Sequence, residues 1–233
     1  MSEQIRILSR SMAVVAALMF VSSSALAISN YTETFASGNA GWTNNSGAAA
    51  GWSSTGGYGG TGGAEVSMDY PFTPLFGSSG PIILRAVGSG ASGGAFVGDW
   101  SNVTSLSIDV KHDGPGVLDF YMRLATPAGF PGGIFPYFGA PVVPNTWTTL
   151  SWNPNGAGAC IDEGAPGSTC PGTIANVGQL QFGTGLGSSY PDPTTVNFAF
   201  DNVNVVPEPG TASMLFLGMG GLGLWGRRNR RDV

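Results

Sequence analysis

Glycine and proline limit what this chain can fold into more than any other feature. The 233 residues include 38 glycines and 16 prolines, and only 10% of them are charged. Glycine and proline both disfavour helix interiors, and so few charges leave little to form the polar face of an amphipathic helix. We therefore expect short β-strands joined by turns, that is, an all-β domain.

Alternation of apolar and polar residues marks the strands. It is clearest at 105–111, where Leu106, Ile108 and Val110 should face a core, and it resumes at 117–124 after a turn. These two segments predict an antiparallel hairpin with a five-residue loop. Weaker strand candidates are 31–35, 64–68, 82–87, 95–100, 146–152, 177–182 and 195–205. Many short strands with Gly/Pro turns predict one antiparallel β-sandwich, a jelly roll, at 28–206.

The N-terminus has the form of a secretory signal peptide. Arg6 and Arg10 precede an apolar run at 12–21, and a small-residue exit follows at Ala25-Leu26-Ala27. Ten apolar residues are too few to span a bilayer, but they fit the translocation and cleavage machinery. We expect the Sec translocon and signal peptidase as partners, removal of 1–27, and a mature chain that begins near Ile28.

Charge narrows the range of partners. Between Ile28 and Val206 there are three basic residues and eleven acidic ones. Such a domain repels phosphate backbones, so nucleic-acid binding is disfavoured, while cations and neutral sugars remain plausible ligands.

The chain has two cysteines, Cys160 and Cys170. Export to an oxidising compartment predicts a disulfide between them that restrains a turn-rich loop. A zinc site or a Cys-His nucleophile is the weaker interpretation, because no histidine lies nearby in the sequence.

The C-terminal tail has three consecutive parts. The motif Pro207-Glu208-Pro209 is followed by an apolar run at 211–226 and by Arg227, Arg228, Arg230 and Arg231. The tail resembles the PEP-CTERM sorting signal, which combines a Pro-Glu-Pro motif, one hydrophobic helix and an arginine cluster. The resemblance implies recognition by an exosortase and release at the cell surface. Sixteen residues with five glycines form a short transmembrane helix, which suits a transient stop in the inner membrane.

Three segments of the body resemble carbohydrate-binding jelly-roll modules. They are 31–35 with Gly41-Trp42, 100–106, and Phe200-Asp201-Asn202-Val203. The resemblance implies a non-catalytic module that binds exopolysaccharide in a biofilm matrix. A purely structural surface protein and a polysaccharide hydrolase stay open as alternatives.

Aromatic residues in Gly/Pro-rich loops are the candidates for sugar contact. The segment 38–63 reads as a long surface loop in which Trp42 anchors to the core. Trp52, Tyr58 and Tyr137 are the predicted ligand-binding residues, because apolar sugar faces stack on exposed rings.

The last strand changes phase and suggests a metal site. Val196, Phe198 and Phe200 share one face, whereas Val203 and Val205 have the other parity, which predicts a β-bulge near Asp201 and Asn202. The bulge could turn Asp201 toward Glu33, which sits where the resemblance places a calcium ligand. We therefore expect Glu33 and Asp201 to hold a structural calcium ion, with a hydrogen-bonded turn as the alternative role of Asp201.

No catalytic residues are predicted. The strings 90–94 and 57–62 match a nucleophile elbow and a dinucleotide loop, but they lack the strand–turn–helix context that both motifs need. The sole histidine, His112, falls in the predicted hairpin turn, where we expect it to be solvated. Asp162 and Glu163 are expected in a solvated loop.

Overall fold

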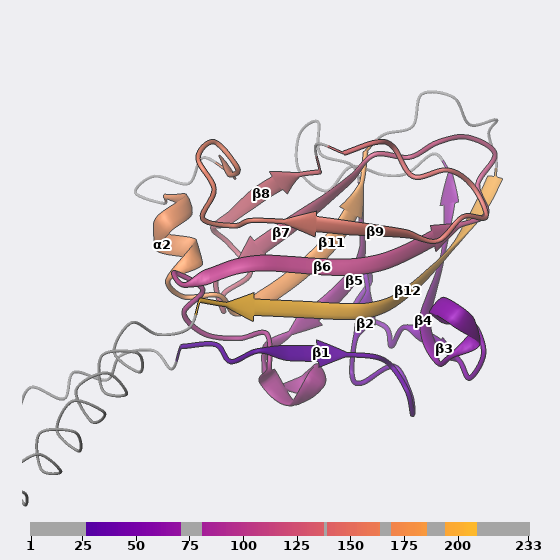
Figure 1. Ribbon diagram of the computed structural model, residues 1–233, viewed down its shortest axis with the longest axis horizontal. Coiled ribbons are helices and arrows are strands. Elements are labelled where there is room, and N and C mark those ends of the chain that lie inside the picture. Colours follow the sequence, from indigo (N-terminus) through magenta and orange to yellow (C-terminus); the bar gives the residue numbers. More distant parts are fainter. Residues whose placement is uncertain (1–26, 71–80, 138, 164–168, 186–193, 209–233) are drawn as a thin grey trace, which may run out of the picture.

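The computed structural model describes residues 27–70, 81–137, 139–163, 169–185 and 194–208 (Figure 1). The signal peptide up to residue 26, Pro209, the apolar run and the four tail arginines lie outside these residues. Within the described ranges, no helix is both long and apolar enough to cross a membrane.

Two antiparallel sheets pack face to face. The front sheet in Figure 1 has the order β3 (Gly51–Ser53), β4 (Gly63–Tyr70), β12 (Thr194–Pro207), β6 (Val103–His112) and β9 (Thr148–Trp152), and β1 (Tyr31–Glu33) also pairs with β12. The back sheet has the order β10 (Ile161–Asp162), β8 (Gly132–Pro136), β7 (Phe120–Ala125), β11 (Gln179–Thr184), β5 (Ile82–Val87) and β2 (Thr43–Asn44). Short helical turns are η1 (Tyr58–Gly60), η2 (Gly88–Gly90), η3 (Ser92–Gly94) and α2 (Cys170–Ile174).

One aromatic-rich core lies between the sheets. Its fully buried side chains include Trp42, Trp100, Phe96, Phe182 and Phe198. The Trp42 ring packs edge-on against Phe96 and stacks on Phe182 of the back sheet, with centroids 5.4 and 6.3 Å away. Each fully buried side chain of this size contributes about 1.5–3 kcal/mol, so this layer holds the sheets together. The predicted β-sandwich and the core role of Trp42 are confirmed.

The predicted hairpin is wrong. β6 pairs with β12 and β9 in the front sheet, whereas β7 pairs with β8 and β11 in the back sheet. The connection crosses the sandwich, and Leu118 pairs there with Val142. Alternation shows that each segment has one core-facing side. In a sandwich both sheets turn one side toward the core, so alternation does not show which sheet a segment joins.

Two other segments differ from expectation. Residues 95–100 form a turn with isolated bridges instead of a strand, although Phe96 and Trp100 are in the core. The expected surface loop at 38–63 contains β2, β3 and η1.

The β-bulge in the last strand is confirmed. The register between β12 and β6 shifts between Asp201 and Asn204, and Asn202 has φ of 49°. The shift returns Val203 and Val205 to the core after Phe200. β12 pairs with β4 before the bulge and with β1 after it, so the bulge lies where its neighbour changes.

His112 is buried, which corrects the expected solvated turn. It is 1% exposed because β6 runs on to residue 112 and the chain then crosses to the back sheet. Its Nδ1 accepts from the Gly114 amide at 3.2 Å, so Nε2 carries the proton and donates to the Val142 carbonyl at 3.0 Å. Burial lowers the pKa of His112, while the Val142 hydrogen bond and nearby Asp113 act against that shift.

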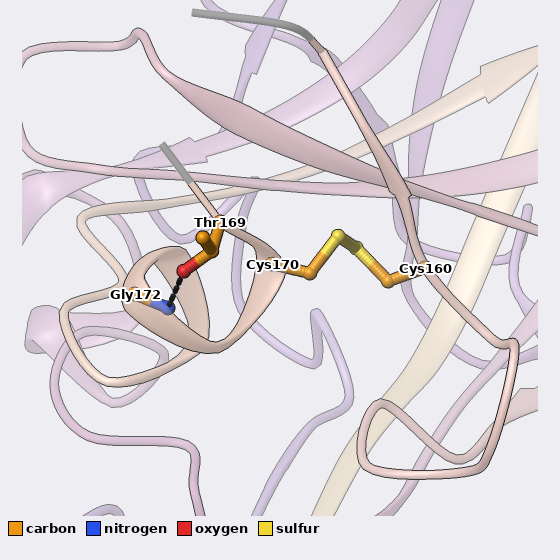
Figure 2. The surroundings of a disulfide bond; sticks show 4 residues. All are labelled: Cys160, Thr169, Cys170 and Gly172. Atoms are coloured by element: carbon orange, nitrogen blue, oxygen red, sulfur yellow. Dashed lines mark hydrogen bonds between the residues drawn. A yellow bond between two sulfur atoms is a disulfide. The ribbon is translucent and has the colours of Figure 1, made fainter. Parts of the chain in front are cut away.

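The expected disulfide joins Cys160 to Cys170, with Cα atoms 6.2 Å apart (Figure 2). Thr169 caps the short helix α2 by accepting from the Gly172 amide at 3.2 Å. The bridge therefore fastens α2, which packs against β7 and β8, to the segment that leads into β10.

Glu163 also differs from the expected solvated loop. Its carboxylate makes a two-pronged ion pair with Arg123 at 2.7 and 2.6 Å, and both side chains are almost fully buried. Asp162 beside it is exposed, as expected.

Candidate functional site

A hollow of about 310 Å³ opens on the outer face of the front sheet. The strand register builds it, because Ala199 of β12 lies opposite both Glu65 of β4 and Lys111 of β6, and Asn197 lies opposite Ser67. These outward positions alternate with core residues along each strand, which gathers polar side chains over three strands. Asp113 and Asn145 complete the rim.

Two aromatic rings lie beyond Lys111, one of the residues that line the hollow, although neither ring lines the hollow itself. Tyr58 in η1 is 50% exposed, and its ring meets Trp147 edge-on with centroids 6.0 Å apart. The ammonium group of Lys111, which lines the hollow, lies 5.1 Å from the centroid of the Trp147 ring. Aromatic surface therefore adjoins hydrogen-bonding groups at one site.

Asp201 holds the turn that carries Tyr58. Its Oδ2 accepts from the Tyr58 amide and from the Thr61 hydroxyl, both at 2.9 Å, and its Oδ1 accepts from the Asn202 amide at 2.7 Å. The side chain is 1% exposed, and burial raises the pKa of Asp201 although these hydrogen bonds oppose the rise. A Cβ at Gly57 would meet the Gly62 carbonyl oxygen at 2.2 Å, so the turn needs glycine there.

Side-chain pairs fix the floor of the hollow. Asp113 accepts from the backbone and side-chain nitrogens of Asn197 at 2.7 and 2.6 Å. Ser67 donates to the side-chain oxygen of Asn197. Since both Asp113 oxygens are engaged, this carboxylate orients Asn197, and the floor is a preset array of donors and acceptors.

The predicted ligand residues are not brought together. Tyr58 packs against Trp147 near the hollow. Trp52, in β3, pairs with Ala64 of β4, so it lies on the opposite face of the sheet from Glu65, which lines the hollow. Trp52 is 40% exposed and donates to the Phe35 carbonyl at 2.7 Å. Tyr137 follows β8 of the back sheet and packs edge-on against Trp152. Sugar contact by Trp52, Tyr58 and Tyr137 stays a prediction.

Trp147 and Lys111 were not among the sequence candidates. The alternation at 105–111 does place Lys111 on the outer face of its strand. Nothing local indicates that Trp147 meets Tyr58, because β9 reaches η1 only through the order of the sheet.

Glu33 and Asp201 lie in separate hydrogen-bond networks. Glu33 accepts from the Phe35 amide at 2.9 Å and from the Ser92 hydroxyl at 2.8 Å, and that hydroxyl in turn accepts from the Trp42 indole. The hydrogen bonds of Glu33 and those of Asp201 have no partner residue in common. No group of three or more His, Cys, Asp or Glu side chains that could hold a metal occurs in the described part of the chain. The calcium ion therefore stays a prediction.

Residues 205–231 match the family model of the PEP-CTERM protein-sorting motif. This chain carries a PEP-CTERM sorting motif. The motif implies an exported protein that passes through a membrane, is processed by an exosortase and ends up at the cell surface. In the structure, Pro207 of the motif is the last residue of β12, and the Glu208 amide donates to the Asn102 carbonyl at 2.6 Å. No curated protein matches the sequence.

Solved structures with a similar fold include carbohydrate-binding modules from Clostridium thermocellum. The family 22 module with the catalytic module of xylanase 10B, complexed with xylohexaose, is 20% identical with a TM-score of 0.46, covering 77% of this chain and 28% of that one. The C-terminal family 22 module of the same enzyme is 17% identical with a TM-score of 0.45, covering 76% and 92%. A family 11 module of a cellulosomal cellulase is 16% identical with a TM-score of 0.42, covering 77% and 95%.

Proposed function

We propose that this chain is an exported, non-catalytic protein whose β-sandwich binds polysaccharide. The observation that carries the proposal is the polar hollow on the front sheet, whose lining residue Lys111 contacts the Trp147 ring, which in turn packs against the exposed Tyr58 ring. Sugars present apolar C–H faces and a rim of hydroxyl groups, and a site for them needs aromatic surface beside fixed donors and acceptors.

The composition of the hollow favours a neutral glycan. Glu65 and Asp113 supply acceptors, Asn145 and Asn197 supply amides, and Lys111 is its only cation. Two carboxylates against one ammonium disfavour an acidic polymer, since like charges repel in a partly desolvated site. Exopolysaccharide of the producing cell is the ligand that fits an exported protein.

The tail supplies the second half of the proposal. After the signal peptide is removed, the apolar run at 211–226 would hold the chain in the inner membrane while the arginines stay inside. An exosortase would then act on the Pro-Glu-Pro motif and free the sandwich at the surface.

The binding proposal is tested by titrating the protein with neutral polysaccharides from its producer. Tyr58→Ala and Trp147→Ala should each weaken binding about two- to tenfold, because one ring contact is worth about 0.5–1.5 kcal/mol. Ile161→Ala, which truncates an exposed apolar side chain in β10 of the back sheet, is the control and should bind like the unaltered protein. Equal binding by all variants would place the site elsewhere.

The same titrations separate the alternatives. Release of new reducing ends would identify a hydrolase and contradict a non-catalytic role. A failure to bind any of the producer's polysaccharides would leave a purely structural surface protein.

A further inference from the structure

The sorting motif begins inside the folded domain. Pro207 lies opposite Val103 in the ladder between β12 and β6, and the Glu208 amide is bonded to the Asn102 carbonyl. One residue earlier, the Val206 carbonyl accepts from the Thr104 hydroxyl at 2.9 Å. No linker therefore separates the sandwich from the motif that is to be processed.

The other chain end is fastened at the same place. Ala27 bridges to Asp99, and the Ile28 amide donates to the Asp99 carbonyl at 3.4 Å. Figure 1 shows β1 beginning, β12 ending and β6 beginning at one end of the sandwich. Ala27 itself is removed with the predicted signal peptide, so we call the surface made of residues 99–102 and Glu208 the tail platform.

Hydrogen bonds with Ile174 and Asn155 hold the main chain of the tail platform in place. Trp100 is fully buried, and its amide donates to the Ile174 carbonyl at 2.9 Å. The side-chain amide of Asn155 donates to the carbonyls of Trp100 and Val103 at 3.0 and 2.9 Å. Ser101 and Asn102 between them are exposed. The platform is therefore a fixed surface with its main chain held from inside.

The short stretch between Glu208 and the apolar run keeps the tail platform close to the enzyme that processes the tail. Two residues, Pro209 and Gly210, separate Glu208 from Thr211, where the apolar run begins, so the two Cα atoms lie at most about 10–11 Å apart. An enzyme that grips the motif beside the membrane must therefore come within that distance of the tail platform. This step rests on the proposed processing of the tail.

The chemistry of the surface favours a protein over lipid. The tail platform carries Asp99 and Glu208 and no basic residue, whereas anionic headgroups attract clusters of Lys and Arg. A hollow of about 380 Å³ opens beside Ser101, and its lining of Pro154, Asn155, Ala159, Ile174 and neighbouring residues is uncharged. Such a surface can receive a loop of a protein partner.

We propose that the processing exosortase docks on the folded sandwich at the tail platform, in addition to gripping the Pro-Glu-Pro motif. The sandwich is then part of the recognition signal, and the tail alone is a poorer substrate. Contact with the rigid surface fixes the position of the motif and lowers the entropy cost of binding it.

The test follows tail removal in the producing cell by mass spectrometry of the full chain. Ser101→Lys places a bulky cation on the tail platform and should slow processing at least tenfold. Ser54→Lys makes the same exposed substitution next to β3 and should be processed like the unaltered chain. Ten Gly/Ser residues inserted between Val206 and Pro207 should also slow processing, because the motif is then separated from the surface.

Each result has one meaning. If the unaltered chain keeps its tail, the proposed processing is wrong. If it is trimmed and both Ser101→Lys and the insertion are trimmed as fast or faster, the docking surface is wrong while processing stands. The melting temperature of each variant shows whether the sandwich itself is intact.

Discussion

The main-chain amide of Tyr58 donates a 2.9 Å hydrogen bond to Oδ2 of Asp201, a residue 143 positions further along the chain. The β-bulge of β12 thus fixes the position of an exposed ring at the candidate site. Asp201→Ala leaves the amides of Tyr58 and Asn202 without their acceptor, while the Thr61 hydroxyl keeps the Tyr58 carbonyl at 2.8 Å. We expect it to lower the free energy of unfolding by about 2 kcal/mol and to weaken glycan binding.

Urea unfolding and the polysaccharide titration measure the two effects. Thr61→Val is the control, because it removes only one of the three hydrogen bonds and should cost about 1 kcal/mol. If Asp201→Ala lost stability but bound the glycan with unchanged affinity, the turn would not position the site.

The second prediction concerns pH and rests on His112, the sole histidine of the chain. Burial lowers its pKa from 6.5, so below pH 6.5 the unfolded chain takes up a proton that the folded chain resists. The free energy of unfolding should therefore fall as the pH drops from 7.5 to 5.5. His112→Gln should flatten this dependence in urea unfolding at the two pH values.

A variant that keeps the full slope would show that other groups cause it. Asp201 acts in the opposite direction, because burial raises its pKa and the folded carboxyl group therefore takes up a proton more readily than the unfolded one as the pH falls.

Local patterns predicted the parts of the fold that depend on local chemistry. Alternation located the core-facing residues Leu106, Ile108 and Val110 of β6, and the change of parity between Phe200 and Val203 located the bulge. In both cases the requirement that alternate residues face one core determines the answer. The cysteine pair was predicted because export favours its oxidation.

The sheet partners could not be read from the same patterns. The segments that became β6 and β7 have equally good apolar faces, and only the whole sandwich decides that they lie in different sheets. The site has the same limitation. Tyr58 was identified from its loop, but Trp147 joins it through strand order, and Lys111 becomes a site residue only because Ala199 lies between it and Glu65.

The third prediction concerns the disulfide. Replacing Cys160 and Cys170 by serine removes a link between residues ten positions apart, and we expect a loss of about 2–3 kcal/mol because the unfolded chain gains freedom. Urea unfolding of the double variant measures it, and the unaltered protein treated with a reductant should match. Glycan binding should persist, since the bridge lies beside the back sheet. A stability equal to that of the oxidised protein would mean that α2 is held by other contacts.

The last prediction concerns the ion pair of Arg123 and Glu163. The guanidinium group also donates to Gln181 at 2.8 Å and to the Gly129 carbonyl at 3.0 Å, so it is fixed among neutral acceptors and one carboxylate. Glu163→Gln keeps the shape but leaves a buried cation without its counter-charge, which should cost about 3 kcal/mol. Asp119→Asn is the control: it removes a carboxylate from an exposed position just before β7 and should change stability by less than about 0.5 kcal/mol. Urea unfolding of both variants decides the matter. Equal stabilities would mean that Glu163 gains too little from Arg123 to repay its own desolvation, and that the neutral acceptors alone satisfy the guanidinium group.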